Sequence, residues 1–215
     1  MTPNREDYIK AIYNYNIIDQ KVTNKLLAES LEISAPSVSE MLNKLIDAKV
    51  LKKDKVLGYE LSLAGQQEAQ RLINKHRLWE VFLVEYLGYT WDQVHDDAEV
   101  LEHATSNLLL ERLNAFLKYP SFCPHGSVIY GNEKREVIEV LLSSVTKGTR
   151  VIVHRVSESE GILSYLFNKK VSLGRTYEIL NVDDFDASVD LLDDNGNTIS
   201  LSKKASELMY VEVLV

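Results

Sequence analysis

The segment AEVLEH, residues 98–103, places two carboxylates and one imidazole on one face of a predicted helix. Glu99, Glu102 and His103 are spaced i, i+3 and i+4, and a helix turns by about 100° per residue, so their side chains point the same way. Carboxylates at this spacing repel each other, and a divalent cation would relieve the repulsion. A trio of this kind is also common as solvated surface or in an ion-pair network.

Two further pairs of residues could bind a metal. His76 and Glu80 are spaced i, i+4 on the preceding predicted helix, and Cys123 and His125 lie in a proline-rich loop. Residues two apart project to the same side of an extended segment, so the thiol and the imidazole can face one ion. Each pair also has a purely structural interpretation, because His76 can pack on its helix and Cys123 can act as a small buried apolar residue.

The composition indicates a globular protein with ample material for a core. The chain has 215 residues, of which 45% are hydrophobic and 26% charged. No apolar run approaches the roughly 18 to 20 residues that span a bilayer, and the N-terminus lacks signal-peptide features, so we expect a cytoplasmic protein with no membrane partner. The single cysteine excludes a disulfide within the chain and suits a reducing compartment.

The charge distribution is compatible with a nucleic-acid partner. A net charge of -8 argues against one at first sight, because neutralising phosphates requires Lys and Arg. However, the first 60 residues contain as many basic as acidic side chains. The acidic excess lies in a middle segment around AEVLEH and in a run near the C-terminus, so the N-terminal segment remains able to contact DNA.

The N-terminal third of the chain has the pattern of a winged helix-turn-helix. Apolar residues at helical spacing predict a helix over residues 5–17, Thr23 can cap a short second helix, and a third helix starts at Ser34 with Pro36 in its first turn. A β-hairpin is predicted over residues 50–62, with a basic tip formed by Lys52, Lys53 and Lys55. The alternative is a plain helical bundle with a surface hairpin.

Helices dominate the middle of the chain. Residues 64–88 predict a long helix, the segment TWDQV opens another, and the helix that holds AEVLEH is expected to continue through LLLERL. The face of this helix opposite the carboxylates is apolar and is expected to pack; it carries Leu101, Ala104 and Leu108. This amount of apolar helical surface indicates a dimer interface.

The C-terminal third is rich in predicted strands. After the proline-rich loop a short helix is expected over residues 132–145, and about five short strands follow from Gly148 onward. Asn195-Gly196 is a strong type I′ hairpin signal. The predicted fold is therefore mainly α with a small β domain: a winged helix-turn-helix (1–63), a helical dimerisation domain (64–143) and an SH3-like β-barrel (144–215).

Five segments in this order resemble the diphtheria toxin repressor family of metal-activated transcriptional repressors. They are REDYIKAIY, LEISAPSVSEMLNKL, KHRLWEVFL, VHDDAEVLEH and CPHG, and the resemblance covers the whole chain. Within the family the chain is most similar to the manganese-responsive regulators of streptococci. The resemblance implies a homodimer that binds palindromic double-stranded operator DNA and represses metal-uptake genes, with no enzymatic activity and no organic cofactor. It also implies that the β-rich tail is a FeoA-like domain.

The resemblance implies a primary regulatory metal site, formed by Asp7, Glu99, Glu102 and His103. Iron-responsive members have a methionine and a cysteine where this chain has Asp7 and Glu99, and the harder oxygen donors suit manganese. Shorter manganese regulators have a glutamate one turn after Asp7, where this chain has Lys10, which counts against a two-metal cluster of their kind.

The resemblance also implies a secondary site that holds a second divalent ion, manganese or zinc. Its residues are His76, Glu80, Cys123, His125 and an acidic residue from the tail, for which Glu160 is chosen over Glu158. His95 is a ligand position in some iron-responsive members and competes for this role. A cysteine, two histidines and a carboxylate would satisfy zinc in tetrahedral geometry.

The positions that resemble the family's DNA-facing residues lie on the third predicted helix and the hairpin. On the helix they are Ser34, Pro36, Ser37, Ser39 and Glu40, and Lys52, Lys53 and Lys55 should contact phosphates. An ion that joins Asp7 to the dimerisation helices would fix the spacing of the two recognition helices. The rival functions are a metal-independent winged-helix regulator and, with less support, a metallohydrolase.

Overall fold

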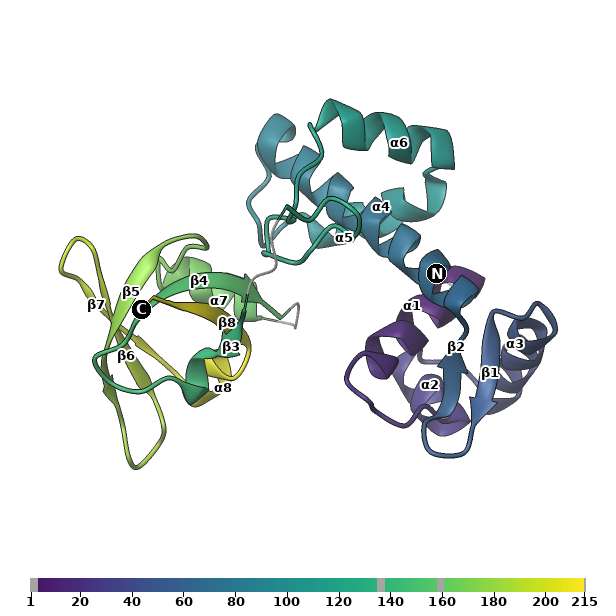
Figure 1. The fold of residues 1–215 in the computed structure, drawn as a ribbon, viewed down its shortest axis with the longest axis horizontal. Helices are drawn as coiled ribbons and strands as arrows, with labels where there is room; N and C mark the ends of the chain where they lie inside the picture. Colours follow the sequence, from purple (N-terminus) through teal and green to yellow (C-terminus); the bar gives the residue numbers. More distant parts are fainter. Residues whose placement is uncertain (1–3, 135–137, 158–160, 215) are drawn as a thin grey trace. The chain divides into compact units, whose positions relative to one another are not determined.

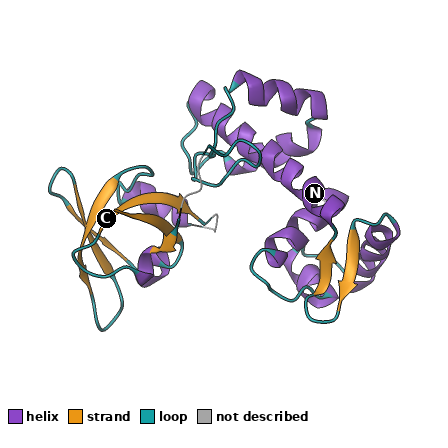
Figure 2. Ribbon diagram, in the orientation of Figure 1, coloured by secondary structure: helices purple, strands orange, loops and turns teal. Residues whose placement is uncertain are grey.

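The computed structural model describes residues 4–134, 138–157 and 161–214, and its contacts divide the chain into two compact units (Figures 1 and 2). The first unit combines Met1–His76 with Glu99–Leu110, and the second combines Arg77–Ala98 with Glu111–Val215. Each unit is therefore built from segments that are distant in the sequence. Within the described residues, no helix has the length and apolar character needed to cross a membrane.

The first unit begins with the predicted helix-turn-helix. Helices α1 (Arg5–Asn16), α2 (Asn24–Ser30) and α3 (Ala35–Asp47) each start at a polar cap. The side chains of Asn4, Thr23 and Ser34 accept hydrogen bonds from backbone N–H groups of the following first turn. The α2 and α3 caps are the residues that the sequence predicts. The apolar faces of the helices are buried together, with Ile9, Ile12, Leu27, Leu42 and Leu45 fully or almost fully covered.

The predicted wing is confirmed as an antiparallel hairpin. Strand β1 (Leu51–Asp54) pairs with β2 (Gly58–Leu61), and Leu51 and Leu61 at its base are buried (Figure 1). Gly58 has φ +77°, and a Cβ added there would lie 2.1 Å from the carbonyl oxygen of Val22. Only glycine fits this position, so the wing is held closely against the segment that joins α1 and α2.

Helices α4 (Leu63–Leu87), α5 (His95–Ala104) and α6 (Asn107–Phe116) form the helical middle of the chain. The expectation of one continuous helix through AEVLEH and LLLERL is wrong, because the helix stops after Ala104. Ser106 caps a separate helix, α6. Its carbonyl accepts a hydrogen bond from the N–H of Leu110 at 2.9 Å, and its hydroxyl accepts one from the N–H of Leu109 at 3.2 Å.

The C-terminal part of the second unit is a six-stranded antiparallel sheet with strand order β3-β8-β4-β5-β6-β7. The strands are β3 (Val140–Leu141), β4 (Arg150–Val156), β5 (Thr176–Val182), β6 (Val189–Asp193), β7 (Thr198–Leu201) and β8 (Met209–Leu214). The expected helix over residues 132–145 is not found in its described part. Val140 and Leu141 pair with β8 and a 3-10 turn, Leu142–Ser144, follows, because Leu142 is buried in the core of the sheet.

The sheet has an apolar core of its own and forms the small β domain that the strand pattern predicts. Alternate residues of the strands point into this core, with Val151, Val153, Ile179 and Leu191 completely buried. The predicted hairpin at Asn195-Gly196 joins β6 and β7, but its turn is not the expected type I′, because only Gly196 of the two residues has a positive φ, of +82°. Helices α7 (Ile162–Asn168) and α8 (Lys203–Ser206) were not predicted.

Candidate metal centre

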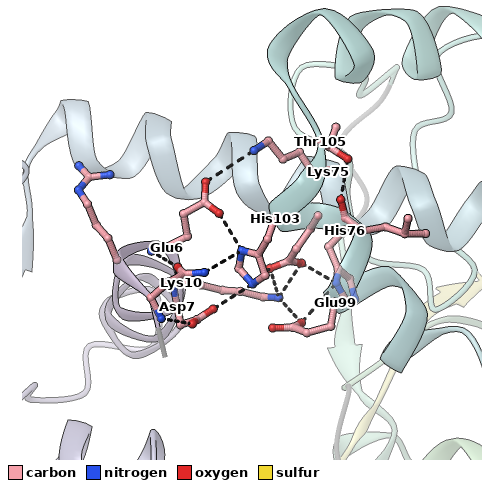
Figure 3. Close-up of polar contacts among 12 residues, drawn as sticks. Glu6, Asp7, Lys10, Lys75, His76, Glu99, His103 and Thr105 are labelled. Carbon is pink, nitrogen blue, oxygen red and sulfur yellow. Dashed lines mark hydrogen bonds and ion pairs between the residues drawn. The ribbon is translucent and has the colours of Figure 1, made fainter. Parts of the chain in front are cut away.

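Three helices of the first unit bring metal-capable side chains together (Figure 3). This first centre is defined by six residues, from α1, α4 and α5: Asp7, Lys10, His76, Glu99, Glu102 and His103. Two overlapping sets of donor atoms each lie within 4.8 Å of one another: Asp7 with Glu99 and His103, and His76 with Glu99 and Glu102. The structure thus brings all four predicted primary residues into one cluster.

A lysine ammonium already occupies a cation position in this cluster. Lys10 Nζ lies 2.8 Å from Glu99 Oε2 and 3.0 and 2.9 Å from the two oxygens of Glu102. Burial by itself would lower the pKa of Lys10, but the carboxylates of Glu102 and Glu99 outweigh it and raise this pKa above its usual value. The donor set therefore fits a positive ion, since three carboxylate oxygens already surround one.

His103 is oriented by acidic residues of α1. Its Nε2 lies 3.1 Å from Asp7 Oδ1, and its Nδ1 lies 2.7 Å from Glu6 Oε2. Burial opposes the charged imidazole, but the hydrogen bond to Glu6 and the charges of Glu102 and Asp7 raise the pKa of His103. Asp7 is itself held by the helix cap, because its Oδ2 accepts from the N–H of Asn4 at 2.6 Å.

Glu6 is a residue of this site that the sequence analysis missed. Besides contacting His103, it lies 3.6 Å from the buried Lys75 of α4, and so links α1 to both other helices. Figure 3 shows its side chain between Lys75 and His103. The signal was present in the sequence, because Glu6 and Lys10 are spaced i, i+4 and share a helix face.

The buried and exposed faces of α5 are the reverse of the expectation within this protomer. Glu102 is completely buried, whereas Val100 is 59% exposed and Leu108, at the start of α6, is 62% exposed. The carboxylate can be buried because Lys10 and the N–H of His76 Nδ1, 2.7 Å from Glu102 Oε2, compensate its charge. The predicted apolar stripe is left uncovered, with Ala104 exposed and Leu101 only partly buried.

A second centre lies in the second unit, and it joins α4 to the proline-rich loop. Its members are Glu80, Cys123 and His125, whose donor atoms lie within 4.8 Å of one another. Glu80 and His125 are completely buried, with 3.1 Å between Glu80 Oε1 and His125 Nδ1, and Cys123 is 5% exposed. Burying a carboxylate, an imidazole and a thiol together is unfavourable in an apolar interior unless charges are paired or a metal is bound, so this donor set fits a cation.

The backbone fixes the orientation of His125. Its Nε2 lies 2.6 Å from the carbonyl oxygen of Trp91, which only accepts hydrogen bonds, so Nε2 carries the proton. In the neutral form of the ring, Nδ1 would then present its lone pair toward Glu80 and Cys123, as in a metal-ligating histidine whose other nitrogen is held by the backbone. Trp91 is a second residue that the sequence analysis did not identify.

The remaining predicted secondary-site residues have different positions. His95, the first residue of α5, is exposed and has a donor nitrogen within 4.8 Å of a donor oxygen of Glu80. The resemblance assigns His76 to the second site; its Nδ1 lies 2.7 Å from Glu102 Oε2 of the first centre, and the assignment stays a prediction. Glu160 and the rejected alternative Glu158 lie outside the described residues.

The predicted DNA-facing residues of α3 form an exposed polar surface. Ser34, Pro36, Ser37 and Glu40 are exposed and Ser39 is partly exposed. Several of the polar groups already have local partners: the hydroxyls of Ser34 and Ser37 are 2.8 Å apart, and Glu40 forms an ion pair with Lys44. On the wing, Lys52 pairs with Glu60 on the neighbouring strand and Lys53 lies over the ring of Tyr59, while Lys55 is in the exposed turn.

Three family profiles match successive parts of the chain. Residues 1–58 match the iron dependent repressor N-terminal DNA binding domain, residues 63–131 match its metal binding and dimerisation domain, and residues 140–213 match the FeoA domain. The chain is 34% identical over 120 residues to the HTH-type transcriptional regulator MntR of Oceanobacillus iheyensis. That alignment covers 55% of this chain and 80% of the relative.

Solved structures of manganese regulators match the whole chain. The manganese regulator SloR is 38% identical with a TM-score of 0.78, and the match covers 100% of both chains. The regulator ScaR with bound Zn2+ is 39% identical with a TM-score of 0.81, over 99% of this chain and 100% of that one. A manganese-dependent transcriptional repressor in complex with manganese reaches a TM-score of 0.87 at 33% identity, over 98% of this chain and 100% of that one.

These matches agree with the helix-turn-helix, the donor clusters and the small β domain described above. They confirm the predicted family and fold, and they exclude the metallohydrolase interpretation because the matched proteins are regulators that bind DNA. The chain belongs to the iron-dependent repressor family of metal-dependent transcriptional regulators, which have a DNA-binding domain and a dimerisation domain.

Proposed function

We propose that this protein is a manganese-activated repressor of metal-uptake genes that binds palindromic operator DNA as a homodimer. The observation that carries the proposal is the composition of the first centre, in which carboxylates of Asp7, Glu99 and Glu102 surround the imidazole of His103. For a given set of ligands, Mn2+ binds most weakly among the divalent first-row metals from manganese to zinc. It therefore depends most on such hard oxygen donors. The names of the matched SloR and manganese-repressor structures support the same ion.

The proposed mechanism follows from the elements that carry the donors. Asp7 and Glu6 belong to α1, which packs in the helix-turn-helix, whereas Glu99, Glu102 and His103 belong to α5. A bound divalent ion supplies positive charge that holds the α1 and α5 carboxylates together. The donors of this chain then order α1, so the recognition helix α3 is held in fewer orientations and less entropy is lost when DNA binds.

We further propose that Glu80, Cys123 and His125 hold a second divalent ion, zinc or manganese. The three side chains are buried and face one another, and the thiolate and imidazole are donors that zinc prefers. A fourth ligand from the tail, for which the sequence indicates Glu160, and His95 as its competitor remain part of this proposal. The matched ScaR structure was determined with Zn2+ bound.

The proposed function can be tested by DNA binding with controlled metal loading. We would select a palindromic duplex from a random library with the full chain, and then titrate binding with Mn2+, Fe2+ and Zn2+ under anaerobic conditions. We expect Mn2+ to give strong binding that a chelator reverses. Binding that is insensitive to the chelator would instead identify the metal-independent winged-helix regulator.

Replacing Lys10 by Met should strengthen Mn2+ binding by about tenfold or more, because it removes a positive charge that competes for the oxygens of Glu99 and Glu102. The metal-free variant should also melt at a lower temperature, since the carboxylates lose their compensating charge. Isothermal titration calorimetry and thermal unfolding measure both effects. The matched control is Lys44→Met, an exposed lysine paired with Glu40, and unchanged Mn2+ affinity in Lys10→Met would contradict the competition.

Replacing Lys53 by Ala at the wing should weaken binding to all DNA sequences to a similar extent. It should also reduce the slope of log affinity against log salt by about 0.9, the value for one lost phosphate contact. The control is Lys147→Ala, an exposed lysine of the sheet domain. Binding measured by fluorescence anisotropy on specific and unrelated duplexes decides the point, and a loss confined to one operator would argue against a phosphate contact.

A further inference from the structure

The C-terminal sheet domain contacts the second centre at three points. The N–H of Val156, at the end of β4, donates to the carbonyl of His125 over 3.1 Å. The side chain of Trp91, whose carbonyl accepts from His125 Nε2, packs against the core of the sheet. Gly126 lies against the backbone of His154. We call these three contacts the β4 seam.

Gly126 allows the closest of these approaches. Its φ is +82°, and a Cβ added there would lie 1.9 Å from the carbonyl oxygen of His154 and 2.8 Å from the Cα of Arg155. Both neighbours are backbone atoms of β4, so they cannot turn away as a flexible side chain could. Any larger residue at this position must therefore separate the loop from β4.

The same residue closes the turn that presents the ligands. The N–H of Gly126 donates to the carbonyl of Cys123 at 2.9 Å, and the N–H of Cys123 donates to the carbonyl of Ser127 at 2.9 Å. Within this turn the N–H of His125 lies 3.4 Å from Cys123 Sγ, and Cys123 Sγ lies 3.9 Å from His125 Nδ1. A shift of Gly126 away from β4 therefore moves the thiol and the imidazole together.

We propose that the C-terminal domain positions the second centre through the β4 seam, with Gly126 as the positioning residue. The domain supports the ligand loop by its backbone, whether or not it also supplies a ligand of its own. This inference rests on the proposed role of Glu80, Cys123 and His125 as a metal site. Because contacts that favour one docked state are reciprocal, an ion in this site also stabilises the docked position of the loop on β4.

The first experiment uses the metal-free full chain and therefore does not depend on metal binding. Cys123 is the only cysteine and is buried, so its rate of reaction with a thiol reagent reports how often the loop opens. We expect Gly126→Ala to react faster by about tenfold or more, which corresponds to about 1.4 kcal/mol. Gly131→Ala is the matched control, because Gly131 has φ +85° but no atom within 4 Å of its added Cβ.

Equal rates for Gly126→Ala and wild type would overturn the proposal. Equal acceleration in both glycine variants would also overturn it, since backbone strain alone would then explain the effect. Mn2+ binding at the first centre and far-UV circular dichroism show whether Gly126→Ala is folded. If it is not, Trp91→Leu provides the same test, because it weakens the packing of the seam without a new steric conflict.

The second experiment measures the site itself with Co2+, whose thiolate complexes have a charge-transfer absorbance. We expect Gly126→Ala to weaken the Cys123-dependent absorbance titration by about tenfold, while Mn2+ affinity at the first centre and Co2+ binding by Gly131→Ala stay at wild-type values. Undiminished Co2+ binding by Gly126→Ala would contradict the positioning role. If the wild type shows no Cys123-dependent absorbance, the second metal site is wrong, whereas the thiol-reactivity result still decides whether the seam holds the loop.

Discussion

Replacing Glu102 by Gln should abolish manganese-stimulated DNA binding, with a loss of about 100-fold or more in apparent Mn2+ affinity. Glu102 is completely buried, and its oxygens lie within 3.0 Å of Lys10 Nζ and 2.7 Å of His76 Nδ1. Glutamine keeps the shape of the side chain but removes the negative charge that the ion and Lys10 both require. Calorimetric Mn2+ titration and operator binding in the presence of Mn2+ measure the two losses.

The control for this variant is Asp96→Asn, which removes one carboxylate from the exposed first turn of the same helix. It should leave Mn2+ affinity within about twofold of wild type, because exposed charges are strongly screened. Sedimentation should show that Glu102→Gln remains a folded dimer. A Glu102→Gln protein that responds to Mn2+ at wild-type concentrations would place the activating ion outside the first centre.

Replacing Leu108 by Glu should dissociate the dimer and thereby remove specific operator binding. Leu108 is 62% exposed in the protomer and lies at the start of α6, and α5 presents Val100 at 59% exposure. Such uncovered apolar side chains in a domain matched by a dimerisation profile indicate a surface that a second copy covers. A buried charge without a partner in that interface should weaken dimerisation by about 100-fold or more.

Sedimentation velocity over a range of protein concentrations measures this effect. The matched control is Phe185→Glu, which places the same charge on a fully exposed aromatic residue in the loop between β5 and β6. The control should remain a dimer and should bind the operator as wild type does. A dimer of normal stability in Leu108→Glu would show that this end of α6 lies outside the subunit interface.

The sequence was sufficient to predict helix caps and hairpins, because these depend on residues close together in the chain. Caps at Thr23 and Ser34, the basic hairpin and the hairpin at Asn195-Gly196 were all predicted and are present in the structure, although the turn of the last is not the predicted type I′. The break between α5 and α6 also has a local signal in the sequence, because Thr105-Ser106 is a pair suited to helix capping. The short helix predicted over residues 132–145 is not found in its described part, because pairing of Val140 and Leu141 with β8 overrode the local pattern.

The donor types and their spacing were also visible in the sequence, but which donors meet was decided by the tertiary structure. Helical periodicity shows that Glu99, Glu102 and His103 share a face, yet it does not show whether that face is buried or exposed. Here Glu102 is completely buried and Glu99 and His103 partly so, because Lys10, about 90 residues away in the chain, supplies the compensating charge. The apolar face, which pattern alone predicts to be inside, is left for a partner.

Two contacts illustrate why periodicity cannot supply such information. His76 and Glu102, which form a hydrogen bond, are 26 residues apart in the chain, and Trp91 and His125 are 34 residues apart. The contact to His125 uses the backbone carbonyl of Trp91, which has no signature in the sequence. The sequence by itself determined the helix-turn-helix, the wing, the β domain and the stock of hard and soft donors. Only the packing of distant helices and loops decided how those donors are grouped, because hydrogen bonds and ion pairs depend on distances of about 3 Å that local propensity does not encode.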